Sequence, residues 1–352
     1  MRGYGMVSVG QVDWINKPRP KCGALDAIVR PKIVAPCSSD THAAHGGAGP
    51  MENRILGHEA VGVVEEVGKD VKRFKKGDFV VVPCATPDWT ELGIQNPKSF
   101  AHDTGMMKSF KFLTSKDGVF SEVFHVNMAD ANMAHLTEGV LPEAALMTVD
   151  MMSTGFHGVE LAEIRYGDTV CVIGIGPVGL MAVAGAKLNG AGRIFAVGSR
   201  PISIQVAKEY GATDIVNYRD GDIVEQVLKL TDGIGVDKVI IAGGDGSVMS
   251  QAVSMCREAG TISSVNFYDV KDRLEIPTVA WGFGMSHKDI HCGFCPGGAE
   301  RTIRMMEMIK HSRIDPTKLI THRFHGWEEL PKAFELMDKK SPYLIKPVVY
   351  LD

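Results

Sequence analysis

A Gly-His-Glu step interrupts an apolar run near residue 58. The run "ILGHEAVGVVEEVG" covers residues 55–68, and its closely spaced valines are typical of a β-strand. A solvated loop explains one polar residue there, but it explains less well two adjacent ionisable side chains, His58 and Glu59. The step is open to three interpretations, which are a metal site, a buried ion pair and an ordinary strand edge.

A thiol lies upstream of this step. The run "APCSSDTH", residues 35–42, contains Cys37, with Ser39, Asp40 and His42 close behind it. Taken alone, Cys37 is more typical of a buried apolar thiol, and His58 of a structural histidine. Thiolate and imidazole are also the usual zinc ligands. Together, ahead of a dinucleotide-binding pattern, the two residues favour a catalytic zinc site.

That pattern is a G-x-G-x-x-G in "TVCVIGIGPVGLMAVAGAKL", residues 169–188. Gly174 allows a tight turn, Gly176 leaves room for a pyrophosphate, and Gly179 lets helix and strand pack closely. A buried-type strand precedes the glycines, and Pro177 suits the first position of a following helix, whose N-terminus binds phosphate. The alternative is a glycine-rich packing turn, but the strand–turn–helix context favours a dinucleotide site.

The next predicted strand indicates which dinucleotide binds. It ends in "FAVGSRP", so Gly198, Ser199 and Arg200 occupy the place where an NAD site usually has an acidic residue. A carboxylate would repel a 2′-phosphate, whereas an arginine would bind it. The sequence therefore predicts NADP(H), with a surface arginine in a loop as the alternative.

The elements that position these residues fall into two patterns. A chain of 352 residues is too long for one core, which favours two domains. Residues 1–150 contain short β runs separated by Gly, Pro and Asp, whereas residues 166–267 alternate apolar strands with helical stretches. The second pattern predicts a Rossmann-type, doubly wound parallel sheet. We expect an α/β fold with domains at 1–150 and 151–296, and a segment 297–352 that returns to the first domain.

Composition excludes several classes of function. The formal net charge of −4 gives no basic field for nucleic acid, and no run reaches the roughly 18 apolar residues of a membrane span. The N-terminus lacks the apolar core of a signal peptide. Seven cysteines, an odd number, fit reduced thiols better than a disulfide framework, which predicts a cytoplasmic protein.

The quoted motifs together carry a family resemblance. The run "GHEAVGVVEEVGKDV" fits the pattern G-H-E-x-x-G-x5-G-x-x-V in full, and "DMMSTGFHG" and "CPGG" add to it. The chain resembles the zinc-containing alcohol dehydrogenases of the medium-chain dehydrogenase/reductase family over essentially its whole length. It is similar in particular to the NADP-dependent secondary alcohol dehydrogenases of anaerobic bacteria and amoebae. This resemblance implies that the β-rich domain is a GroES-like catalytic domain.

The resemblance also implies a ligand set for one catalytic zinc. The metal would be bound by Cys37, His58 and Asp150, where aspartate replaces the second cysteine of many relatives. Glu59 would be a weak fourth ligand, and the alternative, a hydrogen-bond partner of a ligand, has equal weight.

A second, structural zinc is not expected. Many relatives hold one with four closely spaced cysteines, but the corresponding region, from Cys84 to Gly118, contains only Cys84. The pair Cys292 and Cys295 forms a lone C-x-x-C that resembles a redox pair, although a plain loop is the favoured interpretation.

The remaining roles follow from the resemblance alone. It implies that small secondary alcohols and ketones are interconverted by hydride transfer, as in isopropanol dehydrogenases, with Ser39 passing the hydroxyl proton toward His42. The substrate pocket would include Ala85, Phe110 and Phe294. A homotetramer is also implied. The cofactor would contact Gly174, Ile175, Gly176, Pro177, Val178, Gly179, Gly198, Ser199, Arg200, Tyr218, Val265, Asn266, Phe267 and Lys340.

Three aromatic residues depart from the pattern of these relatives. Phe110 stands where they carry Trp, Phe267 where they carry Tyr, and Phe294 where they carry Leu. Substrate range is therefore the property that the resemblance transfers least directly.

Two rival functions remain to be compared. A zinc-free reductase of the same superfamily would keep the glycine turn but lack Cys37 and the Gly-His-Glu step. A binding protein that had lost activity would have lost metal ligands. The sequence retains all of them, which favours the dehydrogenase.

Overall fold

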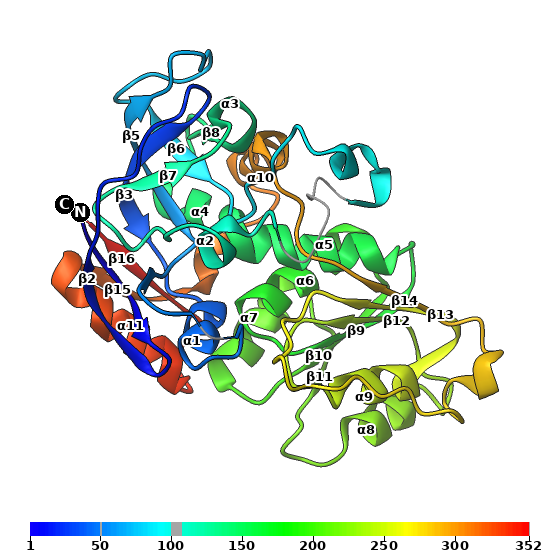
Figure 1. The fold of residues 1–352 in the computed structure, drawn as a ribbon. Helices are drawn as coiled ribbons and strands as arrows, with labels where there is room; N and C mark the ends of the chain where they lie inside the picture. The colour runs from blue at the N-terminus through cyan, green and yellow to red at the C-terminus, as the bar shows by residue number, and fades with distance from the viewer. Residues whose placement is uncertain (50, 100–107, 352) are drawn as a thin grey trace. The chain divides into compact units, whose positions relative to one another are not determined.

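The computed structural model describes residues 1–49, 51–99 and 108–351 (Figure 1). The chain forms two compact units. The first consists of Met1–Ser153 with Cys295–Asp352, and the second of Thr154–Phe294. The first unit is therefore built from two separate stretches of sequence. Among the described residues, no helix has the length and apolar character needed to cross a membrane.

The first unit is mainly β. Its larger sheet has the order β15-β16-β3-β5-β6-β8, and β7 also pairs with β3. The longest pairing is antiparallel, between β3 and β5, and it sets Val34 opposite Ala60. The strands of this sheet are β3 (Ala27–Val34), β5 (Ala60–Val67), β6 (Phe79–Val82), β7 (Phe124–Val126), β8 (Ala134–His135), β15 (Ile320–His325) and β16 (Lys346–Tyr350).

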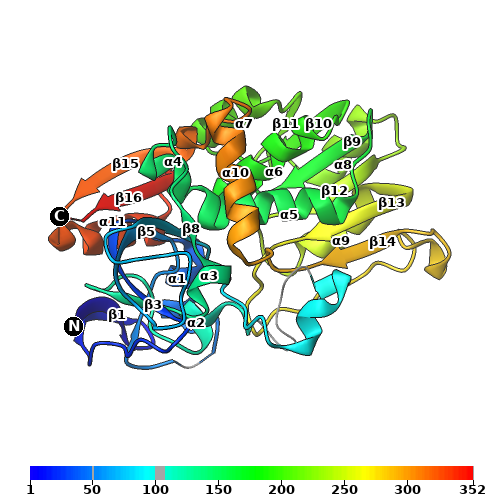
Figure 2. The same cartoon turned by 90° about the horizontal axis from the view of Figure 1, so that it is seen from above.

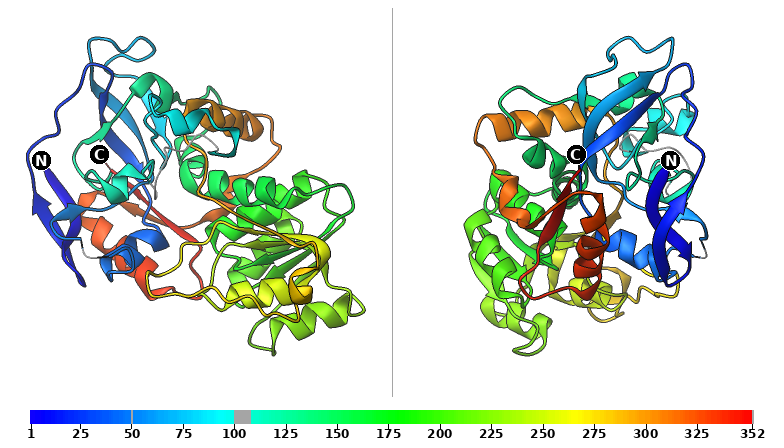
Figure 3. Two further views of the ribbon diagram at one scale, coloured as in Figure 1. Left: turned by 45° about the vertical axis from the view of Figure 1, so that its right-hand side comes forward. Right: turned by 90° about the vertical axis from the view of Figure 1, so that its left-hand side faces the viewer.

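The C-terminal stretch is part of this sheet. Strand β16 pairs antiparallel with β3, with Val349 opposite Val34, and parallel with β15. Figure 3 shows the red strand β16 beside blue strands from the start of the chain. The sequence from residue 297 was expected to return to the β-rich part of the chain, and β15, α11 (Leu330–Lys339) and β16 belong to the first unit.

A smaller sheet and several short helices complete the first unit. The sheet has the order β2-β1-β4, with β1 at Arg2–Ser8, β2 at Gln11–Asn16 and β4 at Arg54–Ile55. Its side chains join those of β3 and β5 in one apolar core that includes Phe112, Phe120 and Phe124. The helices are α1 (Ser38–Ala44), α2 (Lys111–Thr114), α3 (Ala129–Asn132), α4 (Pro142–Leu146), α10 (Ala299–Lys310) and α11 (Leu330–Lys339), with 3-10 turns at Leu92–Gln95, Pro97–Ser99, Pro316–Leu319 and Trp327–Glu329 and a π-helical segment at Thr148–Met152.

The second unit contains a six-stranded parallel sheet. The structure describes all residues of this unit. The strand order β11-β10-β9-β12-β13-β14 can be followed in Figure 2. The strands are β9 (Thr169–Ile173), β10 (Arg193–Val197), β11 (Asp214–Val216), β12 (Val236–Ile241), β13 (Cys256–Ser264) and β14 (Asp289–Cys292).

Helices cover both faces of this sheet. Helix α6 lies on one face, and α8 and α9 lie together on the other (Figure 1). Because the strand order reverses at β9, the crevice between the carboxyl ends of β9 and β12 is a topological switch point, where such folds bind ligands. The predicted doubly wound sheet is confirmed. The helices are α5 (Ser153–Ala162), α6 (Pro177–Leu188), α7 (Pro201–Tyr210), α8 (Ile223–Leu230) and α9 (Val248–Met255), with a 3-10 turn at Gly282–Gly284.

Candidate functional site

Four side chains that the sequence singled out as metal ligands lie together in the first unit. Cys37, His58, Glu59 and Asp150 each offer a ligand atom within 4.8 Å of the others. Asp150 Oδ2 is 3.7 Å from Cys37 Sγ and 3.4 Å from His58 Nε2, and that nitrogen is 3.7 Å from Glu59 Oε1. Bonds of about 2.0–2.3 Å in a tetrahedral site separate ligand atoms by about 3.3–3.8 Å. The spacing therefore suits a zinc ion.

Two paired strands bring the first ligands together. Cys37 follows β3 and is the N-cap of α1, while His58 and Glu59 directly precede β5. Since β3 and β5 are antiparallel, the end of one meets the start of the other. Gly57 has a φ of +91°, and a side chain there would overlap the Phe120 ring. Only glycine fits this turn, which aims His58 at the cluster.

Asp150 comes from a distant part of the chain. It lies in the π-helical segment Thr148–Met152 between α4 and α5. The backbone N–H of Cys84 donates to the Val149 carbonyl at 3.0 Å, which ties this segment to the chain beyond β6. Single π turns are rare and occur often at functional sites. Here the segment supplies the aspartate of the cluster.

Asp40 orients the histidine. One of its carboxylate oxygens is 3.1 Å from His58 Nδ1 and also accepts the Gly57 N–H, while the other accepts the Cys37 N–H at 3.0 Å. A carboxylate behind the imidazole is typical of metal-binding histidines. Burial lowers the pKa of His58, but the carboxylates of Asp40 and Asp150 outweigh it and raise that pKa well above its usual value. Surroundings that retain a proton so strongly also attract a metal cation.

One of the two carboxylate oxygens of Glu59 is bound in a fully buried ion pair. Its Oε1 accepts a hydrogen bond of 2.6 Å from Lys346 Nζ, and both side chains are 0% exposed. Among the described residues, Glu59 Oε2 has no hydrogen-bond partner. A buried carboxylate oxygen without a partner is costly, and a cation in the cluster would remove that cost. Burial raises the pKa of Glu59 to about 7, against the opposing effect of Lys346.

Lys346 and Asp40 are functional residues whose roles the sequence did not reveal. Lys346 lies 287 positions from its partner. A single lysine inside the apolar run "LIKPVVYL" was the available signal, because a lysine is rarely fully buried unless it is paired. For Asp40, only its place in "APCSSDTH" pointed to the site.

The two residues of the predicted proton relay lie on α1. Ser39 Oγ is 3.4 Å from His58 Nε2, so the hydroxyl borders the metal cluster. His42 follows three residues later, which places both side chains on the same face of the helix. Gly47 lies directly against the His42 imidazole, and a side chain at that position would overlap it.

The predicted pocket residues are divided between the units. Ala85 and Phe110 are buried in the first unit, and the Phe110 ring stands edge-on to the His58 ring with 4.9 Å between centroids. Phe110 therefore forms an apolar wall beside the cluster. Phe294 is the last residue of the second unit.

In the second unit the three glycines of the turn have distinct surroundings. Gly174 has a φ of +90°, and a Cβ there would lie 2.8 Å from Gly243, at the end of β12. A Cβ on Gly179 would overlap the Gly174 carbonyl. Gly176, the N-cap of α6, faces open space, where the nearest atom to an added Cβ is Arg200 Nη2 at 3.9 Å. The turn lies at the switch point and leaves room in front of Gly176.

The residues predicted to bind the 2′-phosphate of NADP(H) lie beside this turn. The guanidinium of Arg200 borders Gly176, and Ser199 Oγ donates to the Tyr218 hydroxyl at 2.6 Å. Gly198 packs against Ile175, and a Cβ there would overlap the isoleucine side chain. The Gly198-Ser199-Arg200 run thus follows β10 directly, next to the glycine turn.

The other predicted cofactor residues lie further along the chain. Val265, Asn266 and Phe267 follow β13, and Asn266 Nδ2 donates to the Gly244 carbonyl at 3.0 Å. Lys340 belongs to the first unit, where it ends α11 in a left-handed conformation.

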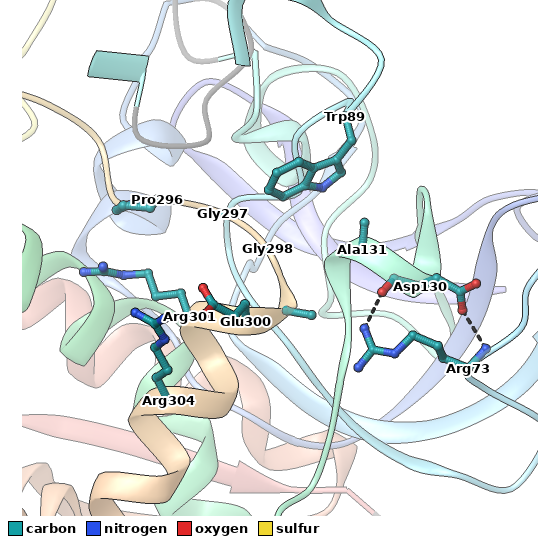
Figure 4. A pocket seen from close by; sticks show the side chains of 11 residues that line it. Arg73, Trp89, Asp130, Ala131, Pro296, Gly297, Gly298, Glu300, Arg301 and Arg304 are labelled. Atoms are coloured by element: carbon teal, nitrogen blue, oxygen red, sulfur yellow. Dashed lines mark hydrogen bonds and ion pairs between the residues drawn. The ribbon is translucent and has the colours of Figure 1, made fainter. Parts of the chain in front are cut away.

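A cavity of about 450 Å³ in the first unit is lined by none of these residues. Figure 4 shows its arginines and the indole of Trp89. Arg73 donates to the Asp130 carbonyl, Arg301 to Ser153, and Arg304 pairs with Glu300. Each of these arginines thus already contacts a neighbouring residue of the first unit.

Comparison with known proteins agrees with this geometry. Residues 23–136 match the family model of the alcohol dehydrogenase GroES-like domain, and residues 177–310 match that of the zinc-binding dehydrogenases. The chain is 55% identical to an NADP-dependent isopropanol dehydrogenase of Thermoanaerobacter brockii over 352 residues, all of both chains. It is also 55% identical to one of Entamoeba histolytica over 350 residues, covering 99% of this chain and 95% of that protein.

A solved structure extends the likeness to the fold. Alcohol dehydrogenase TADH from Thermus sp. ATN1 superposes with a TM-score of 0.86 at 28% identity, and the match covers all of both chains. The GroES-like and Rossmann folds expected from the resemblance are thereby confirmed. The chain belongs to the zinc-type alcohol dehydrogenase family.

Proposed function

We propose that this chain interconverts small secondary alcohols and ketones with NADP(H), using one zinc ion held by Cys37, His58 and Asp150. The observation that carries the metal assignment is the cluster itself, in which Glu59 Oε2 is buried without a hydrogen-bond partner among the described residues. The full-length identity to two NADP-dependent isopropanol dehydrogenases supports the substrate class and the cofactor.

The zinc and the nicotinamide supply the reactive chemistry. A bound zinc would polarise the alcohol or ketone oxygen, and NADP(H) would exchange the hydride. Asp40 holds the imidazole of His58 toward the cluster. Lys346 donates to Glu59 Oε1, the same oxygen that lies 3.7 Å from His58 Nε2, and so holds the carboxylate beside the cluster. Glu59 is therefore both a weak ligand and one half of a buried ion pair.

Ser39 moves the proton in this proposal. A hydroxyl donates and accepts at once, so Ser39 Oγ takes the proton of the alcohol and gives it up toward His42. The position of Ser39 Oγ, 3.4 Å from His58 Nε2, supports this role because it borders the ligand cluster. In ketone reduction the same hydroxyl returns the proton.

Mainly residues of the second unit bind the cofactor in this proposal. The open space at Gly176 and the N-terminus of α6 suit the pyrophosphate. Arg200 beside that turn suits the 2′-phosphate, and Ser199 and Tyr218 form a hydrogen-bonded pair next to it. Lys340, Val265, Asn266 and Phe267 complete the proposed cofactor contacts.

Ala85, Phe110 and Phe294 border the substrate, and the apolar wall of Phe110 favours small substrates.

We further propose a cytoplasmic homotetramer without a four-cysteine structural zinc. The family resemblance supports the assembly. The region from Cys84 to Gly118 contains only one cysteine, Cys84, which supports the absence of a four-cysteine structural zinc.

One set of measurements tests the function. We expect zinc analysis to give about one ion per chain after dialysis, lost in His58→Ala, together with NADPH-dependent reduction of acetone. Losing the charged hydrogen bond of Arg200 should cost about 1.5–3 kcal/mol, or roughly 10- to 150-fold in NADPH affinity, in Arg200→Ala. NADH affinity should stay nearly unchanged, because NADH lacks the phosphate. A parent protein that prefers NADH, or that shows no preference for secondary over primary alcohols, contradicts the proposal.

A further inference from the structure

A second group of potential metal ligands lies behind Asp150. Cys84, Asp150 and Cys295 are buried, and each offers a ligand atom within 4.8 Å of the others. The two sulfur atoms are 3.5 Å apart, and Cys84 Sγ is 3.8 Å from Asp150 Oδ1. The proposed function uses neither cysteine.

The carboxylate of Asp150 faces both groups with different oxygens. Oδ2 lies toward Cys37 and His58, at 3.7 and 3.4 Å, whereas Oδ1 lies toward Cys84. A carboxylate placed in this way can bridge two cations, and paired metal sites are typically about 3.5–4 Å apart. The aspartate is therefore shared between the two groups.

We propose that Cys84, Cys295 and Asp150 Oδ1 form a second metal site that takes a thiophilic divalent cation such as Cd²⁺ or excess Zn²⁺. Zinc–sulfur bonds of about 2.3 Å at a tetrahedral angle place two sulfurs about 3.8 Å apart, close to the observed 3.5 Å. The two thiolates favour such thiophilic cations, and a carboxylate oxygen is also an ordinary zinc ligand. The site rests on the proposed function only in sharing Asp150 with the zinc centre.

Charge balance allows both sites to be filled. Binding of one divalent cation releases the protons of Cys84 and Cys295, so that M²⁺ and two thiols give a neutral metal dithiolate and two protons. The formal charge next to the zinc centre is therefore unchanged. No oxidant is needed, in contrast to a disulfide, which would require the sulfurs to approach to about 2.05 Å.

The segments that carry the ligands are firmly held. The Cys84 N–H bonds to the carbonyl of Val149, the residue before Asp150. Beyond Cys295, Gly297 packs so closely on Ala85 that an added Cβ would lie 2.8 Å from its carbonyl oxygen. The ligands are thus fixed before a cation arrives, which lowers the ordering cost of binding.

Cadmium titration of the reduced, zinc-loaded protein tests the site. The readouts are the ultraviolet thiolate-to-cadmium charge-transfer absorption and the content of both metals per chain. We expect one Cd²⁺ to bind per chain while zinc is retained. Cys84→Ser and Cys295→Ser should each weaken this binding by at least about tenfold, since even partners outside the ligand shell are worth about 10–100-fold. Cys292→Ser is the matched control, because Cys292 is exposed and lies outside the cluster, and it should bind Cd²⁺ like the parent.

Two results would overturn the site. One is cadmium uptake matched by equal zinc release in the parent and in Cys84→Ser, which would mean exchange at the zinc centre only. The other is undiminished binding by Cys84→Ser and Cys295→Ser. Failure of the proposed function is distinguishable, because it would appear as missing zinc and missing ketone reduction, whereas the dependence of the absorption on Cys84 and Cys295 is measured separately.

Discussion

At the scale of single residues, two side chains that are not among the proposed ligands contact the candidate metal cluster. The Asp40 carboxylate accepts hydrogen bonds from the backbone N–H groups of Cys37 and Gly57, and it also contacts the His58 ring. Lys346 neutralises Glu59 where water has no access. Their removal should leave all the ligands in the chain and still damage the centre.

For Asp40, the informative substitution is Asp40→Asn. An amide keeps the size but removes the negative charge and one acceptor, so His58 loses its fixed orientation. We expect zinc affinity to fall about 10–100-fold, the usual cost of losing such a partner. Competition with a fluorescent zinc chelator measures this, with the exposed Asp220→Asn as the control. Equal zinc affinity in the two variants would refute the role of Asp40.

For Lys346, the change Lys346→Met leaves the Glu59 carboxylate buried without its cation. Breaking a buried ion pair from one side typically costs about 3–5 kcal/mol of unfolding free energy. Adding Glu59→Gln removes the stranded charge, so the double variant should recover part of that loss. Urea unfolding measures all three proteins. Lys332→Met, which breaks an exposed pair with Glu329, is the control and should cost at most about 1 kcal/mol. A Lys346→Met variant as stable as this control contradicts the argument.

At the scale of elements, the glycines of the turn between β9 and α6 have different surroundings. Gly179 and Gly174 are needed for packing, because a side chain at either position meets backbone. Gly176 has a negative φ of −76° and open space in front of it. Neighbouring glycines of one motif therefore serve different purposes.

This difference predicts opposite outcomes for two alanine substitutions. Gly179→Ala forces a methyl group into the Gly174 carbonyl and should destabilise the second unit by about 1–3 kcal/mol or more. Gly176→Ala should change stability by less than about 0.5 kcal/mol but weaken NADPH binding. Thermal unfolding and NADPH titration of both variants test this. Normal NADPH affinity in a well-folded Gly176→Ala protein would mean that the pyrophosphate binds elsewhere.

The sequence was sufficient for the elements whose signals are local. The strands Thr169–Ile173, Arg193–Val197 and Val236–Ile241 were predicted from apolar runs, and the turn after the first from its glycines. These segments bury nearly continuous apolar side chains, so composition alone identifies them. The four cluster residues were likewise named from short motifs and family resemblance.

The sequence did not reveal features that depend on distant packing. The π-helical turn around Asp150 has no residue pattern that separates it from an α-helix. Lys346 and Glu59 meet across 287 positions, and Cys84 and Cys295 across 211. The C-x-x-C spacing drew attention to Cys292 with Cys295, but the buried neighbour of Cys295 is Cys84. Side-chain partners of this kind are chosen by the tertiary fold.

At the scale of the whole molecule, the two units differ in continuity. The second unit is one unbroken stretch with its own apolar core, whereas the first needs Cys295–Asp352 to complete its sheet. A fragment of residues 154–294 should therefore fold alone, with a single cooperative thermal transition. A fragment of residues 1–153 lacks β15, β16 and Lys346 and should not. Circular dichroism and amide NMR dispersion of both fragments provide the measurement, and a well-folded 1–153 fragment would contradict this account.

The pairing of Glu59 with Lys346 also has a consequence for the order of events during synthesis of the chain. Ribosomes add about 5–20 residues per second, so the 287 positions between the two side chains correspond to roughly 15–60 s of synthesis. Through that interval the glutamate has been made while its ammonium partner does not yet exist. The Gly-His-Glu step before β5 cannot form this ion pair until β16 has been made. In the proposed metal centre, the Glu59–Lys346 pair therefore forms late in synthesis, although Cys37 and His58 are made early.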